Sequence, residues 1–162
     1  MAESQHYKEL LQLLNEFEVR YLIVGGYAVM KYTEPRYTKD LDVWVERSTV
    51  NSHRIFDALK KFGAPLESDQ VTPGTFTQAD ITYQIGIAPV RVDILTRITG
   101  VEFPHAWENR VNGTVFGISV HFISLDDLIA NKQAAARSSD LEQLKGLPRK
   151  AKSKTDDPGR SI

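Results

Sequence analysis

The sequence lacks cysteine and contains no long hydrophobic run. The absence of cysteine excludes disulfide bonds, thiolate metal sites and cysteine nucleophiles. No apolar segment approaches the ~20 residues that a helix needs to cross a bilayer, so no membrane partner is expected. The first ten residues are polar and lack the basic and then apolar pattern of a secretory signal. These features predict a soluble, cytoplasmic protein.

Neither sign of charge dominates the chain, which has a net charge of −1 over 162 residues. Basic residues are concentrated at one end, since residues 145–162 contain six lysines or arginines and two aspartates. The rest of the chain is therefore mildly acidic, and no DNA-specific binding is predicted. Residues 148–162 have almost nothing to bury and are predicted to form a disordered basic tail. This tail could touch RNA, although a solvated terminus is the favoured interpretation.

Hydrophobic periodicity predicts one domain in which helices and strands are mixed. Helices are expected at about residues 5–18 after a cap at Ser4, at 27–32, after a cap at Thr49, at about 105–110, after a cap at Ser124 and around 141–147. Strands are expected at 21–24, 40–46, 81–87, 90–95 and 115–123, the last one after a turn at 112–113. This order predicts an α/β or α+β sandwich around one sheet.

Three aspartates stand out from the predicted strands that contain them. Asp40 and Asp42 alternate with apolar residues, so both project from the same face of a strand, roughly 7 Å apart at their Cα atoms. Asp93 is a lone acid in the apolar run 90–95, where an unpaired buried carboxylate would be expensive. Alternating acids on a strand are usually a solvated face, but three carboxylates that converge could hold two Mg²⁺ ions for phosphoryl transfer.

Two consecutive glycines lie between the predicted strand 21–24 and the short helix that follows it. Gly25 and Gly26 would let the backbone approach a phosphate closely, and the helix N-terminus offers free N–H groups to an anion. Arg36 or Lys39 could reach a phosphate oxygen, or could be surface charges that pair with the nearby acids. Carboxylates beside such a turn predict a site for a nucleoside triphosphate (NTP).

The order of these motifs resembles the nucleotidyltransferase superfamily of the DNA polymerase β type. It is particularly similar to the minimal nucleotidyltransferases that include toxins of bacterial toxin–antitoxin systems. Members have a Gly-Gly or Gly-Ser turn, then Asp-x-Asp on a strand, then a third acid on a later strand, which correspond here to Gly25-Gly26, Asp40, Asp42 and Asp93. The runs 36–42 (Arg-x-Thr-x-Asp-x-Asp) and 124–140 resemble the toxin-like branch.

This resemblance implies a nucleotidyltransferase domain at 1–147, with a mixed central sheet flanked by helices, a catalytic core at about 20–123 and C-terminal helices at 124–147. It implies an enzyme that moves a nucleoside monophosphate from an NTP, such as ATP, to an acceptor hydroxyl and releases pyrophosphate. The catalytic and metal-binding residues would be Asp40, Asp42 and Asp93, with two Mg²⁺ ions or Mn²⁺ in their place. The nucleotide would be bound by Gly25, Gly26, Tyr27, Arg36, Thr38 and Lys132. The acceptor would be a tRNA, a protein or a small molecule, and a toxin would have a cognate antitoxin as its partner.

Two of these residues have a second interpretation. Many members place serine directly after the glycines, where this chain has Tyr27, whose ring could stack on a nucleobase or, as the favoured interpretation, pack against the first helix. Lys132 could be an ordinary charge on a helix surface. Tyr27 and the short chain leave a second hypothesis open, a catalytically inactive module of the same fold that binds a nucleotide or a protein partner.

Overall fold

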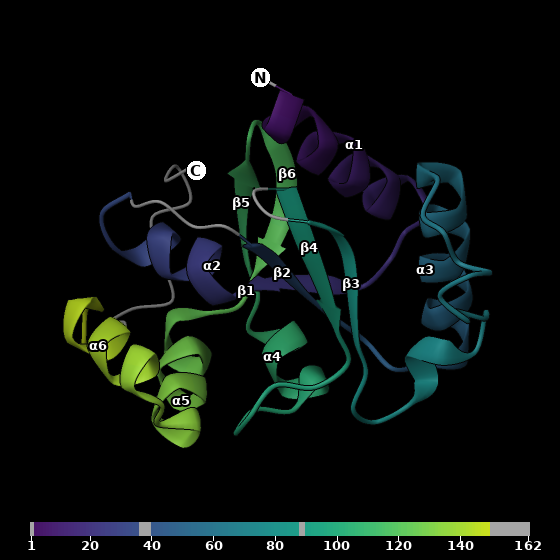
Figure 1. The fold of residues 1–162 in the computed structure, drawn as a ribbon. Coiled ribbons are helices and arrows are strands. Elements are labelled where there is room, and N and C mark those ends of the chain that lie inside the picture. The colour runs from purple at the N-terminus through teal and green to yellow at the C-terminus, as the bar shows by residue number, and fades with distance from the viewer. Residues whose placement is uncertain (1, 36–39, 88–89, 150–162) are drawn as a thin grey trace.

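The computed structural model describes residues 2–35, 40–87 and 90–149 (Figure 1). Its helices are α1 (Ala2–Glu16), α2 (Gly25–Tyr32), α3 (Thr49–Phe62), α4 (Phe103–Glu108), α5 (Leu125–Ala135) and α6 (Ser138–Gly146), with a 3₁₀ turn at Thr75–Thr77. Its strands are β1 (Tyr21–Val24), β2 (Asp40–Val45), β3 (Thr82–Ile87), β4 (Val90–Leu95), β5 (Val111–Val115) and β6 (Ile118–Phe122). Arg36, Thr38, Lys39 and the predicted tail from residue 150 onward lie outside the described residues. None of the described helices is long and apolar enough to cross a membrane.

The strands form one mixed sheet in the order β3-β4-β2-β1-β6-β5. The pairs β1/β2, β3/β4 and β5/β6 are antiparallel, whereas β2/β4 and β1/β6 are parallel. Helices α1 and α3 pack together along one side of the sheet. In a separate group, α5 packs against both α2 and α6 (Figure 1). The predicted fold, a mixed sheet flanked by helices, is confirmed.

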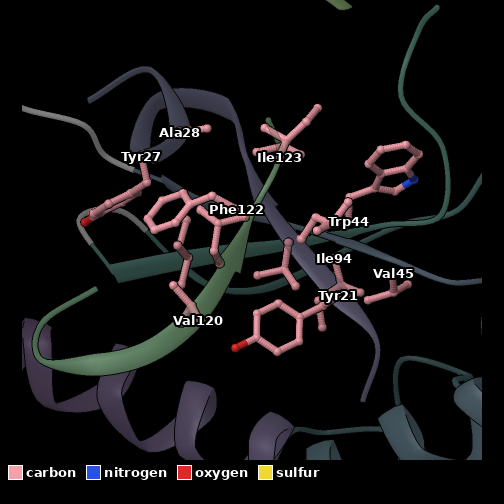
Figure 2. Close-up of a cluster of buried hydrophobic side chains, with 14 of the residues drawn as sticks. Tyr21, Tyr27, Ala28, Trp44, Val45, Ile94, Val120, Phe122 and Ile123 are labelled. Carbon is pink, nitrogen blue, oxygen red and sulfur yellow. The ribbon is translucent and has the colours of Figure 1, made fainter. Parts of the chain in front are cut away.

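The two faces of β2 have different surroundings. One face is fully buried and consists of Leu41, Val43 and Val45. On the opposite face, Trp44 is buried and is covered by Phe103 of α4, with ring centroids 5.1 Å apart, and Figure 2 shows its indole at the edge of the drawn cluster of buried side chains. Asp40 and Asp42 lie on this second face, at the start of the strand, and both are only half-buried. The acids are therefore placed where the apolar cover of this face ends.

The turn predicted at residues 112–113 is wrong, and so is the single strand 115–123. Asn112 and Gly113 lie inside β5, and the chain reverses instead at Phe116 and Gly117. Both of these residues have positive φ, 49° and 81°, as a two-residue hairpin turn of this type requires. Gly113 is needed for packing, because a Cβ atom there would lie 2.8 Å from the ring of Phe122. A glycine that signals a turn in the sequence is thus used for a close approach within a strand.

Two of the predicted helix caps do not cap their helices in the structure. Helix α1 begins at Ala2, so Ser4 lies inside the helix and is not its cap. Helix α3 is capped by Ser48 instead of Thr49, because the Ser48 hydroxyl accepts a hydrogen bond from the N–H of Asn51 at 3.0 Å. Both residue types can cap a helix, and the extended backbone at Ser48 decides between them. The order of elements is unchanged.

Candidate active site

The three aspartates meet because β2 and β4 are parallel neighbours. Their register pairs Asp42 with Asp93 and Asp40 with Arg91. Since register partners on adjacent strands project from the same face, the three carboxylates and the Arg91 guanidinium share one face of the sheet. We call Asp40, Asp42 and Asp93 the acid cluster. The structure therefore brings together the three acids that the sequence selects.

Asp42 lies at the centre of the acid cluster. The pKa of its carboxyl is raised to about 7, first by burial and then by the negative charges of Asp93 and Asp40. The positive charges of Lys132 and Arg91 act in the opposite direction and only partly offset this effect. A carboxylate that is both desolvated and crowded by like charges would be stabilised by a bound cation.

Gly25 begins α2 directly after β1, two residues earlier than the expected helix, so the glycines form the first turn of the helix itself. Its φ is +67°, and a Cβ atom at this position would lie within 2.9 Å of Cγ of Asp42. Glycine is therefore required here by the backbone and by the packed Asp42 carboxylate. The N-cap residue Val24 makes no side-chain hydrogen bond, which leaves the first turn of α2 suited to an anion.

A cleft of about 530 Å³ lies between the start of α2 and the pair α5–α6. Gly25, Gly26 and Asp42 line one wall, and Lys132 of α5 and Asp140 of α6 line the opposite wall. Further polar groups at the cleft are Arg97, Asn131, Arg137 and Ser139. The volume is within the range of small-molecule sites. Asp42 therefore connects the cleft to the acid cluster, whose other two members do not line the cleft.

Lys132 is buried, which excludes the interpretation as a helix-surface charge. Its Nζ donates to Oδ1 of Asp140 at 3.2 Å, and Asp140 also accepts hydrogen bonds from Arg137, the shortest being 2.7 Å from Nε. Helix α5 begins at the predicted cap, where the Ser124 hydroxyl accepts from the N–H of Asp127. The network fixes an ammonium group across the cleft from Asp42.

The Asp140 carboxyl has a pKa lowered to about 2, mainly because Arg137 and then Lys132 hydrogen-bond to its charged form. Its pKa in the unfolded chain is about 3.9, so the ionised group stabilises the fold above pH 4 and this stabilisation is lost as the pH falls toward 2. We expect a loss of about 2 kcal/mol in the free energy of unfolding over this range, measured by urea denaturation. Asp140→Asn should remove the dependence, and Glu142→Gln, which breaks an exposed pair with Lys145, should retain it. Equal dependence in wild type and Asp140→Asn would contradict the assignment.

Arg91 is a charged residue in contact with the acid cluster that the sequence did not single out. Its Nη2 donates to Oδ2 of Asp40 at 2.7 Å and to Oδ2 of Asp93 at 3.2 Å, and its Nε donates to Oδ1 of Asp93 at 3.1 Å. The signal was present, because Arg91 lies two residues before Asp93 and strand alternation places both on the same face. The same strand alternation that places Asp40 and Asp42 on one face therefore predicts the position of Arg91 beside Asp93.

Tyr27 packs in the core and does not line the cleft. Its side chain is 5% exposed and makes edge contacts with the rings of Tyr7 in α1 and Phe116, at centroid distances of 6.2 Å and 6.0 Å. The favoured interpretation, packing against the first helix, agrees with this position. Of the predicted nucleotide contacts among the described residues, Gly25, Gly26 and Lys132 line the cleft, and Tyr27 does not.

The acid cluster fits Mg²⁺ if substrate oxygens complete the coordination. Across the described ranges, no group of three or more His, Asp or Glu side chains is arranged to hold a metal ion by itself. Mg²⁺ is usually bound by one or two carboxylates together with waters and substrate phosphates. Asp42 and Asp93, in register on one face, supply such a pair of oxygen donors, and the crowding that raises the pKa of Asp42 favours a cation beside it.

Comparison with known families identifies the family of the chain. A family model described as a nucleotidyl transferase of unknown function (DUF2204) matches residues 3–157. This range includes the acid cluster, the start of α2 and both helices of the cleft wall. No curated protein matches the sequence.

Proposed function

The chain belongs to the nucleotidyl transferase family of unknown function (DUF2204), and from this premise we propose that it moves a nucleoside monophosphate from an NTP to an acceptor hydroxyl in a Mg²⁺-dependent reaction. One observation supports this most strongly. The Asp42 carboxylate is shared between a cleft lined by Gly25 and Lys132 and a face shared with Asp40 and Asp93. An anionic triphosphate and the acids that would act on it can therefore meet at one side chain.

The residues of the chain would divide the work between binding and alignment. The first turn of α2 at Gly25-Gly26 and the ammonium of Lys132 would bind the β- and γ-phosphates from opposite walls of the cleft. The acceptor oxygen would attack the α-phosphorus beside Asp93, the bond to the bridging oxygen would break, and pyrophosphate would leave. The hydroxyl proton would pass to solvent, and a cation held at Asp93 would lower the affinity of the hydroxyl oxygen for that proton. Bound Mg²⁺ would supply charge neutralisation between the acids and the phosphates.

An active enzyme is favoured over an inactive module. The inactive hypothesis depends on the short chain and on Tyr27 in place of a serine, but the Tyr27 ring lies in the core and does not line the cleft. The candidate acceptors are a tRNA, a protein and a small molecule. A toxin role with a cognate antitoxin rests on the sequence resemblance, and a cytoplasmic location rests on the composition of the chain, which lacks cysteine and long apolar runs.

The proposal is tested by the fate of two labels. The purified chain is incubated with Mg²⁺ and a cell extract, and with each NTP labelled at either the α- or the γ-phosphate. We expect α-label to remain on an acceptor and γ-label to leave with pyrophosphate, because only the α-phosphorus is attacked. The fraction that holds the label, nucleic acid, protein or small molecule, identifies the acceptor. Transfer of γ-label would indicate a kinase instead, and the absence of any transfer with an intact fold would support the inactive module.

A further inference from the structure

The acid cluster contains its own cation. The Arg91 guanidinium contacts Asp40 and Asp93 simultaneously, through one hydrogen bond to the first and two to the second. Its side chain is about one-third exposed, at 32%, whereas that of Asp93 is 11% exposed. Arg91 thus covers the more buried acid from the solvent side.

We propose that Arg91 is the internal counterion of the acid cluster and that a divalent cation displaces it from Asp93. This inference rests on the proposed function, because it concerns the same carboxylates. Both oxygens of Asp93 accept hydrogen bonds from Arg91, so a cation held by Asp93 would compete with the guanidinium for those oxygens. In the metal-free chain the guanidinium therefore contacts Asp93, and in the metal-bound chain it lies away from Asp93.

The hydrogen-bond lengths indicate which contact is released. The bonds to Asp93 are 3.1 Å and 3.2 Å long, whereas the bond to Asp40 is 2.7 Å, within the usual range of short charge-assisted bonds. Arg91 can leave Asp93 while staying attached to Oδ2 of Asp40. Because the side chain is partly exposed, this movement needs no rearrangement of the core.

The charge balance explains why an arginine is placed here. Without a cation, three carboxylates would face one another on a half-buried surface, at a cost in stability. A planar guanidinium satisfies two carboxylates at once, which a lysine ammonium does less well. Arg91 therefore keeps the acids assembled before any metal arrives, at the expense of metal affinity.

The inference is tested by metal binding without nucleotide. Mn²⁺ is titrated into the full chain at pH 8, and free Mn²⁺ is measured by electron paramagnetic resonance for wild type, Arg91→Met and Arg20→Met. Arg20 makes an exposed ion pair with Glu46 and is the matched control. We expect Arg91→Met to bind Mn²⁺ about 10-fold more tightly, because a competing cation has been removed, and Arg20→Met to bind like wild type. The metal-free Tm of Arg91→Met should fall, and the rise in Tm with Mn²⁺ should exceed that of wild type.

A second measurement uses wild type only, in case Arg91→Met does not fold. The Arg91 Nε–H proton should exchange slowly with water in the metal-free chain, because it donates to Asp93, and its exchange rate should rise after addition of Mg²⁺. The exchange rate is measured by NMR. Two outcomes would overturn this inference and leave the proposed function standing. One is an equal or weaker Mn²⁺ affinity in folded Arg91→Met, and the other is an Nε–H signal that Mg²⁺ leaves unchanged while Mn²⁺ binds. If neither protein binds Mn²⁺, the metal site of the proposed function fails together with it.

Discussion

Replacing either Asp42 or Asp93 by asparagine should lower nucleotidyl transfer by about 10³-fold while the fold remains intact. The substitution keeps the shape of the side chain and removes the charge that would hold Mg²⁺ and align the triphosphate, a contribution of several kcal/mol to transition-state stability. Initial rates of α-label transfer measure the loss. Asp57→Asn, a change in α3 on the other side of the sheet, is the control and should transfer at the wild-type rate.

The stability of Asp42→Asn distinguishes a functional role from a structural one. Because the folded-state pKa of Asp42 is raised to about 7, its ionised form destabilises the fold increasingly as the pH rises from 4 through 7. Asp42→Asn should therefore have a higher Tm than wild type at pH 8 and little difference at pH 4. If Asp42→Asn loses transfer and gains Tm, the Asp42 charge contributes to the reaction and not to the stability of the fold. Transfer near the wild-type rate in Asp42→Asn or Asp93→Asn would exclude these residues as the catalytic acids.

The parts of the site that could be predicted from sequence are those fixed by short-range periodicity. Alternation in β2 places Asp40 and Asp42 on one face, and the change from an apolar run to two glycines marks the end of β1 at Val24. The meeting of Asp42 with Asp93 needs the parallel pairing of β2 with β4, which depends on contacts between distant segments. The residues alone indicated that a lone acid in an apolar strand needs a partner, and the family resemblance implied that Asp93 joins Asp40 and Asp42.

The cleft wall was beyond sequence reasoning for a geometric reason. Lys132 and Asp140 lie on different helices, and they meet because Ala136 adopts a positive φ of 51° that reverses the chain between α5 and α6. Helical periodicity describes neighbours within one helix and says nothing about this crossing. The missed β5–β6 hairpin has a similar origin, since Asn112-Gly113 is a stronger local turn signal than Phe116-Gly117 but is used for packing.

Gly25→Ala should reduce both stability and nucleotidyl transfer, since Gly25 meets two independent requirements. The positive φ of +67° costs an alanine about 1 kcal/mol or more in the free energy of unfolding. The new Cβ atom would also collide with the Asp42 carboxylate and push it from its position between the cleft and the acid cluster. A shift of about 1 Å in a catalytic group can lower the rate by about 10²-fold.

Gly117→Ala separates the two effects, because Gly117 also has a positive φ, +81°, but a Cβ atom there meets nothing within 4 Å. Urea denaturation should show destabilisation of both variants, whereas transfer should fall only in Gly25→Ala. In an Asp42→Ala background the cost of Gly25→Ala in unfolding free energy should shrink toward that of Gly117→Ala, since the displaced carboxylate is gone. If Gly25→Ala transferred at the rate of Gly117→Ala, the close packing of Asp42 on α2 would have no part in positioning the acid.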